Sequence, residues 1–433
     1  MDLFFDPAVG ARNIRYFFNL IQPDGYNPVS VRNTRFSVAA PGALAHLFAR
    51  APRLEDLLSR EFKYGELWEV LQSAAEDPEA VVAEILARAE EVEDAEFDRG
   101  YWSDHWTYLV DLLIAYKAIF PDRLAGLFLE KTYTFFDPTH FVLPRSRKYV
   151  LTPRGVRQYG AVEARDDKIA LIASRPRRRY QVRSQGGEGE VVTTTLLGKI
   201  LTLVANKLAS LDPFGVGIEM EADRPGWCDA LNGLPGLFGS SVNETIELKR
   251  LVDFTLEASA GQDGEFSLPV ELADLVSGLD ELLRRPSLTP ESFWRESGQQ
   301  KEAYREKVFM GFDGEERGLT LAMAKRFMVA VSSHLDDAIA RARTLDGIVT
   351  YYAHEAEEYR EIAPGRAEVT RFRQKPLPLF LEGFVHALRV AKSEEVRPLY
   401  DAVRRSALYD EKLGMFRLNA PLGEDALDLG RIG

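Results

Sequence analysis

The sequence predicts a mainly α-helical fold of stacked helical hairpins, interrupted by one small β-rich excursion. Apolar residues recur at three- and four-residue steps along most of the 433-residue chain, which is the period of an α-helix. The helical segments are amphipathic and joined by short links, so that neighbouring helices can pack antiparallel. Residues 141–193 break this pattern with short strand-like runs and Gly/Pro punctuation.

The expected helices can be placed in chain order. The first three cover residues 42–60, 66–75 and 78–97. Pro78 suits the first turn of the third helix. A helix over 104–120 stops at Pro121, and another follows over 122–136. Further helices are expected at 194–211, 243–258, 270–285, 290–309, 319–343, 378–393 and 396–406.

The excursion at 141–193 contains five short runs that favour strands: KYVL, YGAVEA, KIALIA, YQVRS and EVVTTT. It is also strongly basic. Its cationic residues are Arg145, Arg147, Lys148, Arg154, Arg157, Arg175, Arg177, Arg178, Arg179 and Arg183. One interpretation is a solvated surface hairpin in an acidic protein. The other is a wall that attracts an anion such as phosphate.

Composition excludes several classes of function. The net charge of −13 disfavours a general nucleic-acid binder, which needs a basic face. The single cysteine, Cys228, leaves no disulfide framework, and the six scattered histidines form no metal motif. We therefore expect no metal site, no signal peptide, no membrane span and a cytoplasmic location. Dinucleotide, Walker and G-x-S-x-G motifs are absent from the sequence.

The most unusual stretch is 211–240, which is rich in glycine and proline yet apolar. Such a loop is expected to line a cavity. It carries three carboxylates and a tryptophan: Glu219, Glu221, Asp229 and Trp227. Sugars stack on tryptophan, and carboxylates bind hydroxyls or move protons, so the pattern favours a glycosidic site. The alternative is a tight turn in which Trp227 lies in the core and Asp229 caps backbone amides.

A second candidate cluster is GYWSDHWTY at 100–108. Here Ser103 or Asp104 can serve as a helix N-cap, and the aromatic residues can be core residues. Tyr101, Trp102 and Trp106 cannot all share one buried stripe, however. Some of them are expected to face a cavity together with Asp104 and His105.

These segments resemble the cellobiose phosphorylase family and its large oligoglucan phosphorylase relatives. GWCDALNG resembles the GDWNDGMN signature of that family, YWSDHW its DDHLW-type segment, and the tail DALDLGRI its LGRI stretch. Longer blocks, among them KYVLTPRGVRQYGAV and KPLPLFLEGFVHALRV, occur in the same order, so the resemblance covers most of residues 95–433.

The resemblance implies an (α/α)6 barrel and a catalytic apparatus. Asp229 matches the general acid, Trp227 the sugar-stacking residue, and Asp104 the carboxylate that holds sugar hydroxyls. Asn232 also matches the signature. The family signature has Asp and Asn where this chain has Gly226 and Cys228, and Glu219 or Glu221 could replace the missing carboxylate. The N-terminal β-sandwich and the stretch after LGRI are not present, so the resemblance implies one partial catalytic domain over 1–433, with 141–193 inserted in it.

The implied reaction is inverting phosphorolysis of β-glucosides or β-gluco-oligosaccharides to glucose 1-phosphate. No cofactor is needed, and inorganic phosphate is the co-substrate. Asp229 would have to stay protonated near neutral pH, well above the usual carboxyl pKa of about 3.9. His105 and Trp106 are expected to contact sugar, and Arg157 and Gln158 to lie on the anion or substrate side. Glu382 and His386 either reach the cleft or form an exposed helix pair.

Two alternatives remain open from the sequence. An inverting hydrolase on the same barrel would need a carboxylate base, for which Glu219, Glu221 or Glu382 would have to serve. A catalytically inactive carbohydrate-binding fragment is the other. For the phosphorylase, the expected partners are a β-linked glucose oligosaccharide and phosphate, together with a companion chain that supplies the missing parts or a homo-oligomer. Neither nucleic acid nor membrane is an expected partner.

Overall fold

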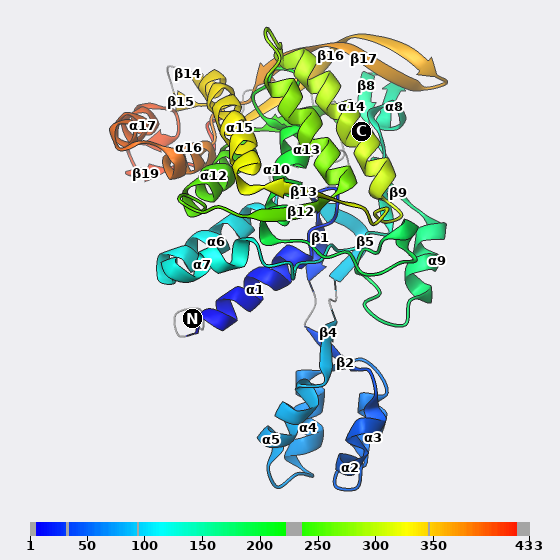
Figure 1. Cartoon of the computed structure of the whole chain (residues 1–433). Helices are drawn as coiled ribbons and strands as arrows, with labels where there is room; N and C mark the ends of the chain where they lie inside the picture. Colours follow the sequence, from blue (N-terminus) through cyan, green and yellow to red (C-terminus); the bar gives the residue numbers. More distant parts are fainter. Residues whose placement is uncertain (1–5, 32–33, 93–94, 222–235, 345–346, 422–433) are drawn as a thin grey trace.

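The computed structural model describes residues 6–31, 34–92, 95–221, 236–344 and 347–421. The protein is a mixture of helix and strand, with 49% of residues helical and 22% in strands, and it contains a six-stranded antiparallel sheet curled into a half-barrel. The predicted mainly-α (α/α)6 barrel is therefore wrong. Helical hairpins are present, but they pack around and beside a sheet rather than closing into a toroid (Figure 1).

The helical body has one buried helix at its centre. α10 (Leu196–Leu208) is buried along all its residues, and the hydroxyl of its N-cap Thr195 accepts a hydrogen bond from the Gly198 amide. The surrounding helices are α1 (Pro7–Asn19), α6 (Thr107–Ile119), α7 (Pro121–Phe128), α12 (Val242–Ala258), α13 (Val270–Leu283), α14 (Pro290–Val308) and α15 (Leu321–Ala342). Their apolar stripes form one continuous core. In the described part of the chain no helix has the length and apolar character needed to cross a membrane.

The large sheet joins distant parts of the sequence. Its strands, in spatial order, are β10 (Ile218–Glu219), β11 (Phe238–Ser241), β16 (Tyr351–Ala363), β17 (Arg366–Pro376), β7 (Tyr149–Thr152) and β8 (Gly155–Gln158). β16 and β17 form a long hairpin that turns at Gly365, whose φ of 71° favours glycine. Trp294 of α14 packs against the sheet beside Phe238 and Phe372.

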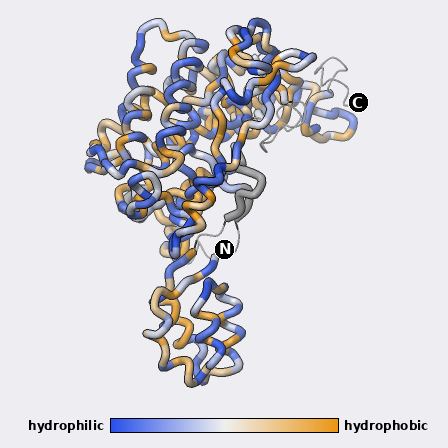
Figure 2. The backbone as a smooth tube through the Cα atoms, turned by 90° about the vertical axis from the view of Figure 1, so that its right-hand side faces the viewer, coloured by the Kyte–Doolittle hydropathy of each residue, from blue (hydrophilic) through white to orange (hydrophobic). Residues whose placement is uncertain are grey.

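A small unit is inserted between two paired strands near the N-terminus. β1 (Asn27–Val31) and β5 (Ala95–Trp102) pair antiparallel and form a neck, with Val31 opposite Ala95. The unit beyond the neck stands apart from the body in both views (Figures 1 and 2). It contains β2 (Arg35–Val38), η2 (Pro41–Leu44), α2 (Ala45–Phe48), α3 (Arg53–Leu58), β3 (Phe62–Lys63), α4 (Tyr64–Gln72), α5 (Pro78–Leu86) and β4 (Ala89–Val92). Its hydrophobic core is separate from that of the body.

The segment 141–193 mixes short strands and helices. Its elements are β6 (His140–Val142), α8 (Arg145–Lys148), β7, β8, β9 (Val162–Ala164), α9 (Asp166–Ser174) and η3 (Gln185–Gly187). KIALIA, predicted as a strand, lies in the helix α9. Buried Asp137 holds this segment through Lys168 and Arg175, each at 2.6 Å.

The C-terminal part forms a smaller cluster on the body. α16 (Leu381–Val390) and α17 (Ser393–Arg405) pack against α12 and α15 in a second core. Three two-stranded ribbons complete the described secondary structure: β12 (Glu265–Pro269) with β13 (Glu316–Thr320), β14 (Arg343–Thr344) with β15 (Gly347–Ile348), and β18 (Tyr409–Asp410) with β19 (Met415–Phe416).

Candidate functional site

The Gly/Pro-rich loop of the sequence prediction connects two neighbouring strands of the large sheet. Residues 220–237 run from β10 to β11, which pair antiparallel. Trp227, Asp229 and Asn232 lie in this connection, within 222–235, and therefore outside the described residues. The described residues at the two ends of the loop and around Asp104 define the candidate site.

Asp104 lies just before α6 and is 2% exposed. Its Oδ1 atom has no hydrogen-bond partner among the residues that the structure describes. A buried polar atom without a partner is costly, so such atoms are uncommon in folded proteins. The predicted carboxylate is therefore buried, with one oxygen available for a hydrogen bond.

The surroundings of Asp104 favour its protonated form. Burial, the negative charge of Glu244 and, to a smaller extent, that of Glu382 raise the pKa of Asp104 to about 7, although Lys207 opposes them. Lys207 lies 3.4 Å from Glu244 and also donates to the carbonyl of Ser103. Asp104 is thus a carboxyl group able to hold a proton close to neutral pH.

His105 and Trp106 have different surroundings. Trp106 is completely buried, and its Nε1 donates to Glu244 at 3.3 Å. It is thus part of the core and orients Glu244. The His105 ring meets the Tyr108 ring edge-on, with centroids 5.6 Å apart. Burial lowers the pKa of His105, which keeps its imidazole neutral near pH 7.

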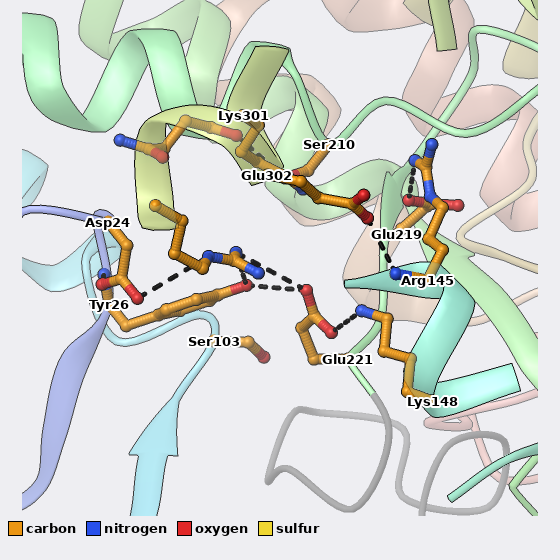
Figure 3. Close-up of polar contacts among 12 residues, drawn as sticks. Asp24, Tyr26, Ser103, Arg145, Lys148, Ser210, Glu219, Glu221, Lys301 and Glu302 are labelled. Carbon is orange, nitrogen blue, oxygen red and sulfur yellow. Dashed lines mark hydrogen bonds and ion pairs between the residues drawn. The ribbon is translucent and has the colours of Figure 1, made fainter. Parts of the chain in front are cut away.

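Glu221 is the centre of a buried polar network at the start of the loop (Figure 3). Tyr26 donates its hydroxyl to Glu221 Oε1 at 2.8 Å, and Lys148 donates to Oε2. Arg305 lies 4.0 Å from Glu221 and 3.9 Å from Asp24. Burial alone would raise the pKa of Glu221, but the charges of Lys148 and Arg305 hold it well below its usual range.

Glu219 is held by a second, adjoining set of contacts. Arg145 donates to its Oε2 at 2.9 Å and Trp294 donates to its Oε1 at 2.7 Å. The Arg145 guanidinium also stacks 4.1 Å over the Trp294 ring. Glu219 and Glu221 therefore act as anchors for cations at one end of the loop.

A buried lysine lies between the two glutamate clusters. Lys301 on α14 donates to Ser210 Oγ at 2.7 Å and is 5% exposed. Burial, with the nearby positive charge of Arg305, lowers the pKa of Lys301 to about 7, although Glu221 opposes the shift. Like Asp104, Lys301 can change its charge near neutral pH.

The other predicted residues are spread around this region. Gln158 is buried on β8, and its backbone amide donates to the Gly236 carbonyl at the far end of the loop, at 2.8 Å. Arg157, on the same strand, donates to the Val156 carbonyl. Glu382 accepts from the Tyr351 hydroxyl at 2.8 Å and contributes to the electrostatics of Asp104. His386 turns instead to Glu247, at 2.6 Å.

The structure adds residues that the sequence analysis did not single out. Lys207 and Glu244 lie beside Asp104. Around Glu221 the structure adds Tyr26, Lys301 and Arg305, and Arg305 connects the cluster to Asp24. A usable signal was the presence of charged residues on the apolar faces of α10, α12 and α14. Among the described residues, no group of three or more His, Cys, Asp or Glu side chains is arranged to hold a metal ion. No family model and no curated protein matches this chain.

Proposed function

We propose that this chain is a carbohydrate-active enzyme that cleaves β-glucosides or β-gluco-oligosaccharides by inverting phosphorolysis. The observation that supports this most directly is the buried Asp104, whose pKa is about 7. A carboxyl group that is protonated near neutral pH can donate a hydrogen bond to a sugar hydroxyl, which is the role proposed for Asp104. A location in the cytoplasm fits the single cysteine of the sequence.

In the proposed reaction, phosphate is the nucleophile and a carboxylic acid of the protein is the proton donor. A phosphate oxygen attacks the anomeric carbon, and the bond from that carbon to the leaving oxygen breaks. The leaving oxygen takes its proton from a carboxylic acid, for which the sequence favours Asp229. Asp104, in its protonated form, donates a hydrogen bond to a sugar hydroxyl. Inversion at the anomeric carbon converts the β-linkage into α-glucose 1-phosphate.

The charges around Glu221 support phosphate as the attacking group. Lys148 and Arg305 are cations beside Glu221, and Arg305 also lies near Asp24. Lys301, whose pKa is about 7, adds a further positive charge when it is protonated. With Lys301 protonated, the positive charges of this cluster outnumber the carboxylates Asp24 and Glu221, and the cluster lies next to the start of the loop that carries Asp229. Phosphate is already anionic, so its recognition needs cations and amide donors rather than a base.

The decisive experiment compares product formation with and without phosphate. Purified protein is incubated with β-linked gluco-oligosaccharides, and glucose 1-phosphate is measured. We expect phosphate-dependent product, which Asp229→Asn removes and Asp104→Asn reduces mainly by raising KM. Full turnover by Asp229→Asn would reject Asp229 as the acid, and no product with any β-glucoside would reject the proposal.

An inverting hydrolase is a second candidate because of Glu382. Its carboxylate is near enough to Asp104 to raise the pKa of that residue, and Tyr351 orients it. Inverting hydrolases pair a protonated acid with a second carboxylate that activates water. In the same assay, release of free sugar without phosphate, abolished by Glu382→Gln, would favour hydrolysis.

A further inference from the structure

A large pocket lies between the inserted unit and the body. Its volume is about 790 Å³, against about 360 Å³ for the pocket beside Arg145 and about 560 Å³ for one within the inserted unit. It shares no lining residue with the Asp104 or Glu221 clusters. We call it the interdomain cleft. Its size is that of typical small-ligand sites, which range from about 300 to 1,000 Å³.

Both walls of the interdomain cleft carry aromatic rings. Phe17 of α1 is 40% exposed on the body side, and Tyr64 at the start of α4 is 48% exposed on the other side. Burying a large apolar side chain usually stabilises a protein by about 1.5–3 kcal/mol. Two such rings left open on opposite walls of one concavity indicate a surface that binds something.

The rings are held in place by their neighbours. Tyr64 stacks nearly parallel on Trp68, with centroids 6.4 Å apart and an interplanar angle of 9°. Phe17 meets Tyr16 edge-on at 5.4 Å. The open face of a fixed ring is a platform for a flat apolar surface, and the C–H face of a pyranose ring is such a surface.

Polar groups around these rings suit hydroxyl groups rather than a polyanion. The cleft is lined by the two cations Arg12 and Lys63 and by three carboxylates. The carboxylates are Glu66, Glu69 and Glu91. Acids therefore outnumber bases, which disfavours nucleic acid. Asn13 adds an amide that can both donate and accept hydrogen bonds.

We infer that the interdomain cleft is an accessory saccharide-binding site in which Phe17 and Tyr64 stack against sugar rings and the polar rim binds hydroxyls. The site holds an oligosaccharide on the inserted unit, away from the residues that would carry out catalysis. The inference rests on the proposed function only in the choice of β-linked glucose oligomers as probes.

The test measures binding by isothermal titration calorimetry on the full chain. The probes are cellohexaose and laminarihexaose, which are β-1,4- and β-1,3-linked glucose hexamers, with maltohexaose as the α-linked comparison. We expect Tyr64→Ala and Phe17→Ala each to weaken binding of a β-linked probe by about tenfold or more. Tyr64→Phe keeps the ring and should bind like the wild type.

The matched control is Tyr359→Ala, which removes an aromatic ring of similar exposure from the β16–β17 hairpin. It should leave binding unchanged, and thermal melts of all variants check that they fold. Turnover of a short aryl β-glucoside is measured in parallel. If the protein does not turn over the β-glucoside but binds a β-linked hexamer in a way that depends on Tyr64, the saccharide site is upheld and the proposed function is rejected. The inference is overturned if no probe binds, or if both alanine variants bind like the wild type.

Discussion

At the scale of single residues, the protein places ionisable groups where their charged forms are disfavoured. Asp104 and Lys301 are both buried, and both have a pKa of about 7, reached from opposite directions. Burial is the largest cause in each case, because a low-dielectric environment penalises a charge of either sign. Perturbed groups of this kind gather at functional sites more often than elsewhere.

Replacing Asp104 by asparagine should make stability less sensitive to pH. A pKa raised from 3.8 to about 7 means that ionising Asp104 at high pH costs the folded state up to the order of 4 kcal/mol. The stability contributed by protonated Asp104 is fully present below pH 4 and is lost as the pH rises through 7. Between pH 4 and 8 the free energy of unfolding of the wild type should therefore fall relative to that of Asp104→Asn, because only the wild type has this carboxyl group to ionise.

Chemical denaturation at several pH values measures this difference. Val110→Ala serves as the control, because it shortens a fully buried, uncharged side chain on α6. The loss of unfolding free energy that Val110→Ala causes should not vary with pH through the substituted residue itself, because no ionisable group is removed. A constant difference between Asp104→Asn and the wild type would contradict the raised pKa.

Glu221 should matter for stability because removing its charge leaves buried cations uncompensated. Glu221→Gln leaves Lys148 without its carboxylate partner and Arg305 with Asp24 alone, and breaking a buried pair in this way costs about 3–5 kcal/mol. Denaturant titration of the variant measures the loss. Asp401→Asn, which breaks the exposed pair with Arg397, should cost only about 0.3–0.5 kcal/mol. Equal losses of unfolding free energy in the two variants would show that the buried network around Glu221 does not stabilise the fold more than an exposed ion pair does.

At the scale of elements, α16 is fastened to α12 by one buried carboxylate. Glu247 on α12 is fully buried and accepts from His386 at 2.6 Å and from Arg389 at 2.9 Å, both on α16. Burial would raise the pKa of Glu247, but hydrogen bonds from His386 and Arg250 outweigh it and lower the pKa to about 2. Since α16 also carries Glu382, this attachment positions one of the candidate catalytic groups.

Glu247→Gln should loosen α16 selectively. Hydrogen bonds to charged groups contribute about 1.5–3 kcal/mol each, so amide hydrogen exchange over Leu381–Val390 should accelerate roughly 10- to 100-fold. In the wild type the same protection should be lost as the pH falls from 4.5 towards 2, because the pKa of Glu247 is depressed in the folded state. Arg397→Ala, on α17, should leave α16 unaffected. Unchanged exchange in Glu247→Gln would rule out this attachment.

Most helices could be predicted from the sequence, because amphipathic periodicity records directly which face is buried. The predictions for 243–258, 270–285 and 290–309 agree closely with α12, α13 and α14. The β16–β17 hairpin could not be predicted in this way. The outer half of β16 is exposed and rich in Glu and Arg, so this strand lacks the alternation of apolar and polar residues that marks a half-buried strand. β17 does alternate, with Ala367 and Val369 buried, but its apolar run is short.

The candidate site was predictable only in part. Asp104 was found because it sits in an unusual aromatic segment. Its neighbours Lys207 and Glu244 come from α10 and α12, and only tertiary packing brings these together. Trp106 was expected to contact sugar, but the structure places it in the core. Sequence spacing cannot distinguish an aromatic residue that lines a cavity from one that fills the interior.

At the scale of the whole molecule, the missed sheet and the missed inserted unit have the same cause. The large sheet pairs strands from 149–158, 218–241 and 351–376, and no local pattern records such long-range pairing. The inserted unit has ordinary helical periodicity, so its segments looked like further hairpins of the body. Its separateness depends on which core its apolar faces join, and this is a property of the tertiary structure.

The inserted unit should be removable without unfolding the body. Val31 and Ala95 are paired across β1 and β5, so residues 32–94 can be replaced by Asn-Gly, which favours the tight turn of a two-residue hairpin. Among the described residues, the polar contacts between unit and body that are lost include Arg177 to the Ala39 carbonyl at 2.7 Å and Arg178 to Glu90 at 3.5 Å. Exposed contacts of this kind contribute at most about 1 kcal/mol each.

Calorimetry and circular dichroism of this deletion variant measure the outcome. Because the body keeps its own core, we expect one cooperative transition near the wild-type melting temperature, with a helical spectrum retained. The variant lacks Tyr64 and should no longer bind oligosaccharide through the interdomain cleft, while turnover of a short aryl β-glucoside persists. If the body is unfolded or aggregated in this variant, the two cores depend on each other for folding, and the expectation that the body folds without the inserted unit is wrong.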